Sequence, residues 1–212
     1  MAKIAVVVLN GYEIEDRDVL KEYVDKKFDI YACDGGANLL YQDKIVPKII
    51  LGDLDSIKIE SLDWFEKQGV AIEKYSVVKD SSDAEILFEK ISASYEEICV
   101  IGGLGKRFDH ALVNIFLLEK FSKLRFVSKT EEIFCVKDHK KISGKSGKII
   151  SILSLSEESR LTLQGLIYPL QSEVLYRSSS RGLSNVIAQD IAQIDVERGC
   201  VMCIINNREE KE

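Results

Sequence analysis

Two carboxylates separated by one residue follow a strongly apolar segment. The run PKIIL (47–51) leads into GDLDS (52–56), which places Asp53 and Asp55 at positions i and i+2. In extended backbone such side chains point to the same side, and their charges repel unless a cation lies between them. Carboxylate oxygens suit Mg²⁺, which usually also binds substrate phosphates. We therefore expect a Mg²⁺ site at Asp53 and Asp55, although both acids could instead cap a following helix.

A second pair of acids, Asp80 and Asp83, stands at the start of segment 83–94, where apolar residues recur with helical spacing. A serine–glutamate capping box fits this start, and a carboxylate at the first helical position suits the helix dipole. Helix capping therefore explains Asp83 on its own but leaves Asp80 unexplained. Both acids are candidates for the same metal site.

The segment GGLGKRFDHALVN (102–114) combines glycines with polar side chains. Glycines allow backbone to approach a ligand closely, and free N–H groups before a helix favour phosphate. The segment matches neither the Walker A loop nor GxGxxG. Arg107 is expected to neutralise phosphate oxygens, and His110 and Asn114 share one helix face. Asp109 is a candidate catalytic aspartate, with a helix cap as the alternative.

Two further clusters combine turn residues with polar groups. In CDGGAN (33–38), Asp34 with Gly35, Gly36 and Asn38 could hold a ribose or a base edge, although a tight turn explains the glycines equally well. The stretch SSSRGLSN (178–185) is typical of a turn between strands.

The elements that position these residues follow two different patterns. Up to about residue 129, apolar strand-like runs alternate with helical segments, which predicts a largely parallel, Rossmann-like sheet with helices on both faces. The expected strands are 3–9, 28–34, 48–51, 71–76, 97–103 and 124–128, and the expected helices are 15–26, 36–42, 58–68, 83–94 and 109–122. Residues 130–212 show short β-like runs separated by Gly, Ser and Asn, which predicts an all-β sandwich.

In a parallel sheet, ligands bind beyond the carboxyl ends of the strands. The polar motifs of residues 1–129 follow those ends, so they are expected to share one site. We interpret 1–129 as a nucleotide-binding catalytic domain and 130–212 as a second domain.

Composition limits the partners of the chain. The net charge is −6 and no Lys/Arg-rich stripe occurs, so we expect no nucleic-acid partner. No segment has the length or flanks of a membrane span or a signal peptide, so we expect no membrane association. The five cysteines are irregularly spaced, which suggests reduced thiols in a cytoplasmic protein. The Cys200–Cys203 pair lies in a strand-like run and is not expected to bind zinc.

The order of the motifs is more specific than any one of them. DGGAN, GDxDS, DxxD, a Gly-rich RxDH with Asn four residues later, and GLSN in a β-rich tail together resemble the thiamine pyrophosphokinase family. The resemblance covers nearly the whole chain. It implies a homodimer with active sites near the interface, ATP and thiamine as substrates, and pyrophosphoryl transfer that yields thiamine diphosphate and AMP.

The resemblance also implies roles for individual residues. The Mg²⁺–ATP acids would be Asp53, Asp55, Asp80 and Asp83, and the phosphate-side and nucleotide-side cluster would be Arg107, Asp109, His110 and Asn114. The turn at Asp34 would belong to the nucleotide cleft. Ser184 and Asn185 would bind thiamine and the β-rich domain would mediate dimerisation. Lys106 departs from the family, which commonly has Gly at that position, and Ser81–Ser82 replaces its threonine pair.

Three functions fit these residues. With Mg²⁺ and ATP the acids and Arg107 could transfer pyrophosphate to thiamine, and either Asp83 or Asp109 could accept the alcohol proton. A Mg²⁺-dependent nucleotide hydrolase would use the same acids but would leave the GLSN segment without a role. A non-catalytic thiamine or nucleotide sensor would need fewer charges.

Overall fold

The computed structural model describes residues 3–207, and these residues form two compact units. The first comprises residues through Leu117 together with Lys123–Lys129, and the second comprises Leu118–Ser122 and the chain from Thr130 onward. The chain thus passes between units at Lys129/Thr130, and one short segment at the end of a helix groups with the second unit. The two units are an α/β domain and a β-sandwich, as the sequence predicts.

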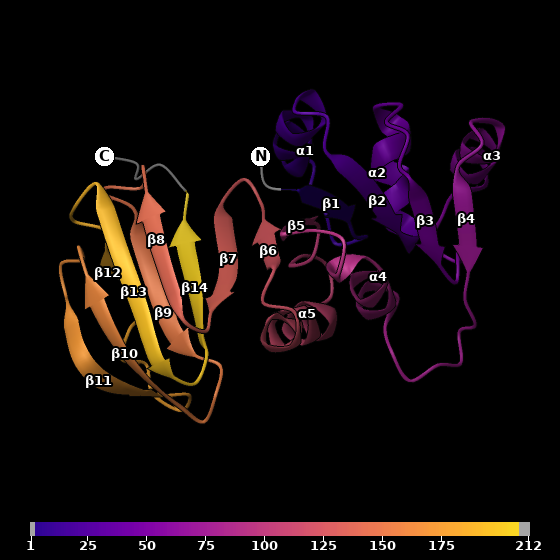
Figure 1. The fold of residues 1–212 in the computed structure, drawn as a ribbon. Helices are drawn as coiled ribbons and strands as arrows, with labels where there is room; N and C mark the ends of the chain where they lie inside the picture. Colours follow the sequence, from indigo (N-terminus) through magenta and orange to yellow (C-terminus); the bar gives the residue numbers. More distant parts are fainter. Residues whose placement is uncertain (1–2, 208–212) are drawn as a thin grey trace. The chain divides into compact units, whose positions relative to one another are not determined.

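The α/β unit is built on six parallel strands (Figure 1). Their order in the sheet is β6-β5-β1-β2-β3-β4. Four of the six carry runs of buried, mostly apolar side chains, as expected for a sheet covered on both faces. The strands are β1 (Ile4–Val8), β2 (Asp29–Cys33), β3 (Ile49–Gly52), β4 (Ala71–Lys74), β5 (Glu97–Ile101) and β6 (Leu124–Val127).

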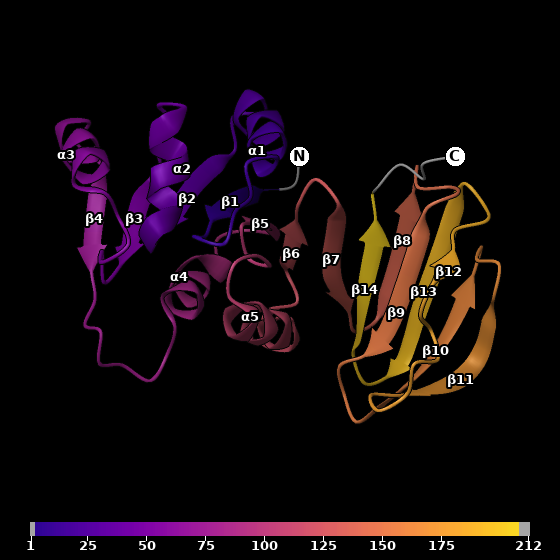
Figure 2. The ribbon, with the colours of Figure 1, turned by 180° about the vertical axis from the view of Figure 1, so that it is seen from behind.

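Helices follow the strands and cover both faces of this sheet. Figures 1 and 2 show α1, α2 and α3 on one face and α4 and α5 on the other. The first face packs a continuous core of buried side chains, among them Leu20, Leu39 and Phe65. The helices are α1 (Asp16–Asp25), α2 (Ala37–Gln42), which continues a short 3₁₀ turn η1 (Asp34–Gly36), α3 (Ile59–Lys67), α4 (Asp83–Ser92) and α5 (Phe108–Lys120).

The strand order creates a crevice at one defined place. From β1 the chain adds β2, β3 and β4 on one side, and it then returns to add β5 and β6 on the other. The loops that follow β1 and β5 therefore diverge at the carboxyl ends of two adjacent strands. Such a switch point is where open α/β sheets bind their ligands.

The second unit contains two four-stranded sheets with the orders β12-β9-β14-β7 and β11-β10-β13-β8. The pairs described within each sheet are antiparallel, and alternate residues, such as Ile150 and Ile152 of β9, enter the shared core. The strands are β7 (Glu131–Val136), β8 (His139–Ser143), β9 (Ile149–Ser154), β10 (Glu158–Gln164), β11 (Leu170–Tyr176), β12 (Asn185–Val186), β13 (Ile191–Arg198) and β14 (Val201–Asn206).

Three observations test expectations about the strands, the cysteines and membrane-spanning helices. Strand β8 is not predicted from the sequence, because it is an edge strand in which only Ile142 is buried. All five cysteines are free and buried, and Cys203 lies in the interior of β14. No helix within residues 3–207 is long and apolar enough to cross a membrane.

Gly36 shows how tightly the turn after β2 packs on the end of β1. A Cβ atom at this position would lie 2.1 Å from the carbonyl oxygen of Val8. We therefore expect Gly36→Ala to lower the free energy of unfolding by more than 2 kcal/mol, since backbone must move to relieve the clash; this is an order-of-magnitude figure of roughly the size seen for overpacked sites. Urea denaturation of the purified variant measures this effect.

Gly69→Ala is the matched control for that measurement. Gly69 has φ +73° but has no atom within 4 Å of the added Cβ, so only the left-handed backbone conformation costs energy, about 1–2 kcal/mol. A Gly36→Ala protein as stable as the Gly69→Ala protein would show that the turn does not need close contact with β1.

Candidate active site

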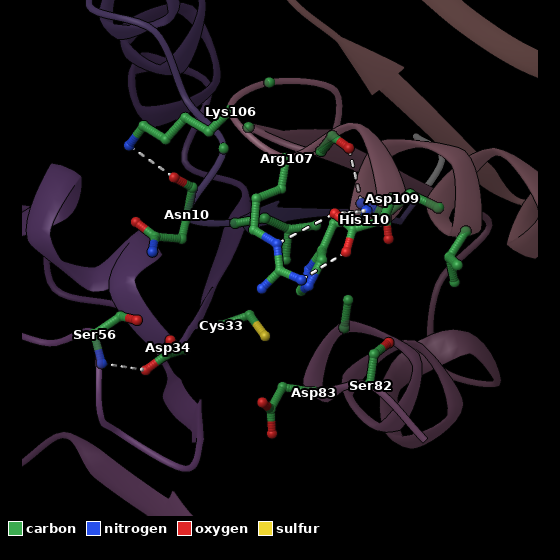
Figure 3. A pocket seen from close by; sticks show the side chains of 18 of the residues that line it. Asn10, Cys33, Asp34, Ser56, Ser82, Asp83, Lys106, Arg107, Asp109 and His110 are labelled. Atoms are coloured by element: carbon green, nitrogen blue, oxygen red, sulfur yellow. Dashed lines mark hydrogen bonds and ion pairs between the residues drawn. The ribbon is translucent and has the colours of Figure 1, made fainter. Parts of the chain in front are cut away.

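A pocket of about 630 Å³ opens at the switch point of the α/β sheet (Figure 3). The loops after β1, β2, β3 and β5 line it, together with the first residues of α4 and α5. Five parts of the chain far apart in sequence therefore meet at one edge of the sheet. Most of the motifs identified in residues 1–129 contribute to this pocket.

Three carboxylates gather at the ends of β2 and β3. Oxygen atoms of Asp34, Asp53 and Asp55 all lie within 4.8 Å of one another. Two unit charges at that separation repel by about 1 kcal/mol even at the dielectric constant of water. A hard divalent cation that takes several oxygen ligands would remove this repulsion, so the donor set fits Mg²⁺. Asp34, assigned from sequence to the nucleotide, thus lies with the proposed metal ligands.

The fold disfavours both the charge and the backbone conformation of Asp34. Burial, and to a smaller extent the nearby charge of Asp53, raises the pKa of the Asp34 carboxyl, although hydrogen bonds from the backbone and from Ser56 oppose this effect. The backbone of Asp34 is left-handed with φ +46°, and Leu54 between the other two acids has φ +69°. Such conformations cost energy in non-glycine residues and cluster at functional sites.

Asn38 fixes the loop that carries the other two carboxylates. Its side-chain nitrogen donates to the carbonyl oxygen of Ser56 at 2.9 Å, and its side-chain oxygen accepts from the amide of Lys58 at 3.0 Å. The Asn38 side chain is buried. Asn38, expected from sequence to bind the nucleotide, therefore has its amide engaged in supporting the loop that carries Asp53 and Asp55.

The structure separates the predicted site residues into two groups. Within the described chain, the pocket lining includes Asp34, Asp53, Asp55, Asp83, Arg107, Asp109, His110 and Asn114. It does not include Gly35, Gly36, Asn38 or Asp80. The two glycines are buried beneath the pocket, whereas Asp80 is exposed on the loop before α4. No observation tests a catalytic or metal-binding role for Asp80, which stays a prediction.

Asp83 occupies the first position of α4 and faces the pocket (Figure 3). Ser82 caps this helix by accepting from the Glu85 amide at 3.2 Å, as the sequence predicts. The Asp83 carboxylate accepts a hydrogen bond from Lys79 Nζ at 2.5 Å, and both side chains are about four-fifths buried. Sequence reasoning does not identify Lys79, because it lies outside the helix and its only signal is an acid four residues later.

The loop before α5 presents cations to the same pocket. Arg107 donates from Nε and Nη2 to the two oxygens of Asp109, at 3.2 and 2.6 Å, and this ion pair lowers the pKa of Asp109. Lys106 has φ +62°, a left-handed conformation that favours glycine, and its Nζ donates to the carbonyl oxygen of Asn10 at 2.9 Å.

The two remaining nucleotide-side residues differ in environment. His110 is exposed at the pocket rim, whereas Asn114 is buried and donates to the carbonyl oxygen of Gly103 at 2.8 Å. Asn114 therefore fixes the glycine loop, and His110 is free to meet a ligand.

The predicted thiamine-binding pair lies in the β-sandwich. Asn185 is buried, accepts from the Tyr168 amide at 3.0 Å and donates to the Tyr168 carbonyl at 2.8 Å. Ser184 is exposed with φ +54°, and its amide donates to Ser151 Oγ at 3.1 Å. Asn185 thus places the loop that carries Tyr168, whose side chain is 66% exposed.

A substitution at Asp34 tests whether the three carboxylates are held against repulsion. Asp34→Asn removes one charge, keeps a hydrogen-bond acceptor and suits the left-handed backbone. We expect it to stabilise the ligand-free protein by about 1 kcal/mol, which raises Tm by roughly 2–4 °C, and to abolish any further rise on adding Mg²⁺. Differential scanning calorimetry with and without Mg²⁺ measures both effects.

The same substitution has a defined pH dependence. A folded-state pKa above that of the unfolded chain destabilises the protein only where Asp34 is ionised. The stability gain should therefore be full at neutral pH and should vanish as the pH falls below the unfolded-state pKa. Asp63→Asn, an exposed change on α3, is the control. A less stable Asp34→Asn protein that still responds to Mg²⁺ would contradict the prediction.

Comparison with known proteins agrees with the fold and the motifs. Residues 20–128 match the model described as "Thiamin pyrophosphokinase, catalytic domain", and residues 132–201 match "Thiamin pyrophosphokinase, vitamin B1 binding domain". Thiamine pyrophosphokinase 2 of Oryza sativa subsp. japonica is 33% identical over 147 residues, which span 59% of this chain and 54% of the rice protein. Thiamine pyrophosphokinase of Bacillus subtilis is 28% identical over 193 residues, 87% of this chain and 90% of that protein.

The crystal structure of thiamine pyrophosphokinase from B. subtilis superposes with a TM-score of 0.86 at 24% identity and covers 97% of this chain and 100% of the other, which shows the same fold. Because the catalytic-domain model alone matches about half of the residues, and both domain models match in order, the chain belongs to the thiamine pyrophosphokinase family.

Proposed function

We propose that this protein transfers a pyrophosphoryl group from ATP to the hydroxyl oxygen of thiamine in a Mg²⁺-dependent reaction, giving thiamine diphosphate and AMP. The observation that carries the proposal is the meeting of three carboxylates with Arg107 in one pocket at the switch point of the sheet. Membership of the family supplies the substrate class.

The reaction needs few covalent steps from the protein. The thiamine hydroxyl oxygen forms a bond to the β-phosphorus of ATP, and the bond from that phosphorus to the oxygen bridging the α- and β-phosphates breaks. AMP leaves with the electron pair, and the hydroxyl proton passes to a base. Catalysis of such transfers rests on positioning and on neutralising charge.

The side chains of the pocket divide these tasks. Asp34, Asp53 and Asp55 would hold Mg²⁺, which supplies charge neutralisation for the phosphate oxygens when bound. Arg107 is oriented by Asp109 and offers donors to the charge that develops on the phosphates. Asp83 and Asp109 are both candidates to accept the proton. The lowered pKa of Asp109 makes it a weaker acceptor than an ordinary aspartate.

We propose that thiamine is bound by the loop around Ser184 and Tyr168. The Ser184 hydroxyl is exposed, and the exposed Tyr168 ring offers an aromatic face to a cationic heterocycle. Asn185 would act by holding the Tyr168 backbone in place.

We also propose a homodimer. The resemblance implies that the β-rich domain mediates dimerisation, and the exposed apolar side chains at helical spacing on α5 of the first unit, Phe108, Leu112 and Phe116, add a surface of the kind that is buried between subunits. A cytoplasmic location remains a prediction from the cysteine pattern.

Identification of products tests the proposed function. Incubation with ATP, Mg²⁺ and thiamine should yield AMP and thiamine diphosphate in equal amounts, resolved by chromatography. Asp53→Asn keeps the side-chain oxygen that accepts the Asp55 amide at 3.2 Å but removes the charge, so turnover should fall by about two orders of magnitude or more while the fold stays intact.

Asp63→Asn is again the control and should keep the wild-type rate. Phosphate or pyrophosphate released without thiamine would instead indicate a hydrolase, and binding without turnover would indicate a sensor. Either result, or an Asp53→Asn protein with a near-normal rate, would overturn the proposal.

A further inference from the structure

Lys79 is a charged, largely buried residue of the site region to which neither the motifs nor the family comparison assign a role. Its side chain is 17% exposed and that of Asp83 is 20% exposed. It lies on the loop between β4 and α4, four residues before Asp83 and outside the helix. Burying an ammonium group to this extent is costly unless it is paired, so the pair with Asp83 is specific rather than a chance surface contact.

The surroundings of Asp83 explain why it needs a cationic partner. Cys33 lines the same pocket, and after burial the charges of Asp83 and Asp34 are the main causes that raise the pKa of its thiol. Asp83 therefore lies within electrostatic reach of the end of β2, where three other carboxylates already gather. Without Lys79, the Asp83 carboxylate would add an unpaired fourth negative charge to this region.

Asp83 is nevertheless separate from the carboxylate cluster. The three acids whose oxygens lie within 4.8 Å of one another do not include it, whereas Lys79 holds it at 2.5 Å. The helix cap fixes the backbone of Asp83, and Lys79 fixes its carboxylate, so backbone and side chain are held by two independent contacts.

We infer that Lys79 is a positioning residue that holds the Asp83 carboxylate directed into the pocket for pyrophosphoryl transfer. The inference rests on the proposed function and adds a residue to its machinery. Lys79 acts through Asp83 and need not touch the substrates. Displacing a reacting or orienting group by about 1 Å can cost 10²-fold in rate, which sets the expected size of the effect.

Steady-state kinetics of Lys79→Met test this role. The substitution removes the charge and keeps much of the apolar stem, so kcat should fall about 100-fold while KM for ATP and for thiamine change less than about threefold. Lys79→Arg, which keeps the charge, should restore kcat to within about tenfold of the wild type. Lys90→Met is the matched control, because Lys90 lies on α4 and pairs with Glu73 of β4 at 3.0 Å, and neither residue belongs to the pocket lining; it should leave kcat unchanged.

A double-substitution cycle separates positioning from direct substrate contact. Because Lys79 acts only through Asp83, Lys79→Met should lower kcat no further in an Asp83→Asn background. Additive losses, a rise in KM for ATP alone, or an unchanged kcat in Lys79→Met would each overturn the inference.

A readout without turnover keeps this test independent of the proposed function. Lys79→Met leaves a largely buried carboxylate unpaired and should lower Tm of the ligand-free protein by about 2–4 °C, whereas the same change in the Asp83→Asn background should have little effect. An inactive wild type would refute the proposed function and leave this coupling measurable. Equal Tm losses in the two backgrounds would refute the Lys79–Asp83 coupling.

Discussion

Repulsion among three carboxylates within 4.8 Å of one another is the constraint on which the site depends. The sheet imposes this closeness, because β2 and β3 are adjacent parallel strands whose carboxyl ends place Asp34 beside the GDLDS loop. Left-handed backbone at Asp34 and Leu54 adds cost, and Asn38 prevents the loop from relaxing outward. The fold therefore maintains a close group of carboxylates whose mutual repulsion a bound divalent cation would relieve.

Around the pocket, other side chains that face the ligand are likewise held in place by a supporting contact. Asp83 is held by a helix cap and by Lys79, Arg107 is held by Asp109, and Asn114 holds the glycine loop. Each ligand-facing group thus has a partner that restricts its motion before any substrate arrives. Such preorganisation is what transfer of a phosphoryl-type group requires of a protein.

Much of this arrangement is predictable from sequence because it follows from local patterns. Apolar runs ending in polar turns predict the six strands to within about two residues at most ends, and parallel strands bring their carboxyl ends together, so the acids and Arg107 are found by position. Asp34 is predicted as a site residue but is assigned to the nucleotide, whereas in the structure it lies with Asp53 and Asp55. The sequence does not reveal this, because it does not give the order of the strands in the sheet. The edge strand β8 is missed because only Ile142 of its five residues is buried. Asn38, Asn185 and Lys79 act through contacts with backbone or side chains that spacing alone does not reveal.

The most direct measurement is the position of the metal ion itself. A crystal grown with Mn²⁺, which shares the oxygen preference of Mg²⁺, and a non-hydrolysable ATP analogue allows the ion to be located by anomalous scattering. The account predicts a peak bonded to oxygens of Asp34, Asp53 and Asp55 and to the phosphates of the analogue. A peak bound elsewhere, with these three carboxylates turned away from one another, would contradict it.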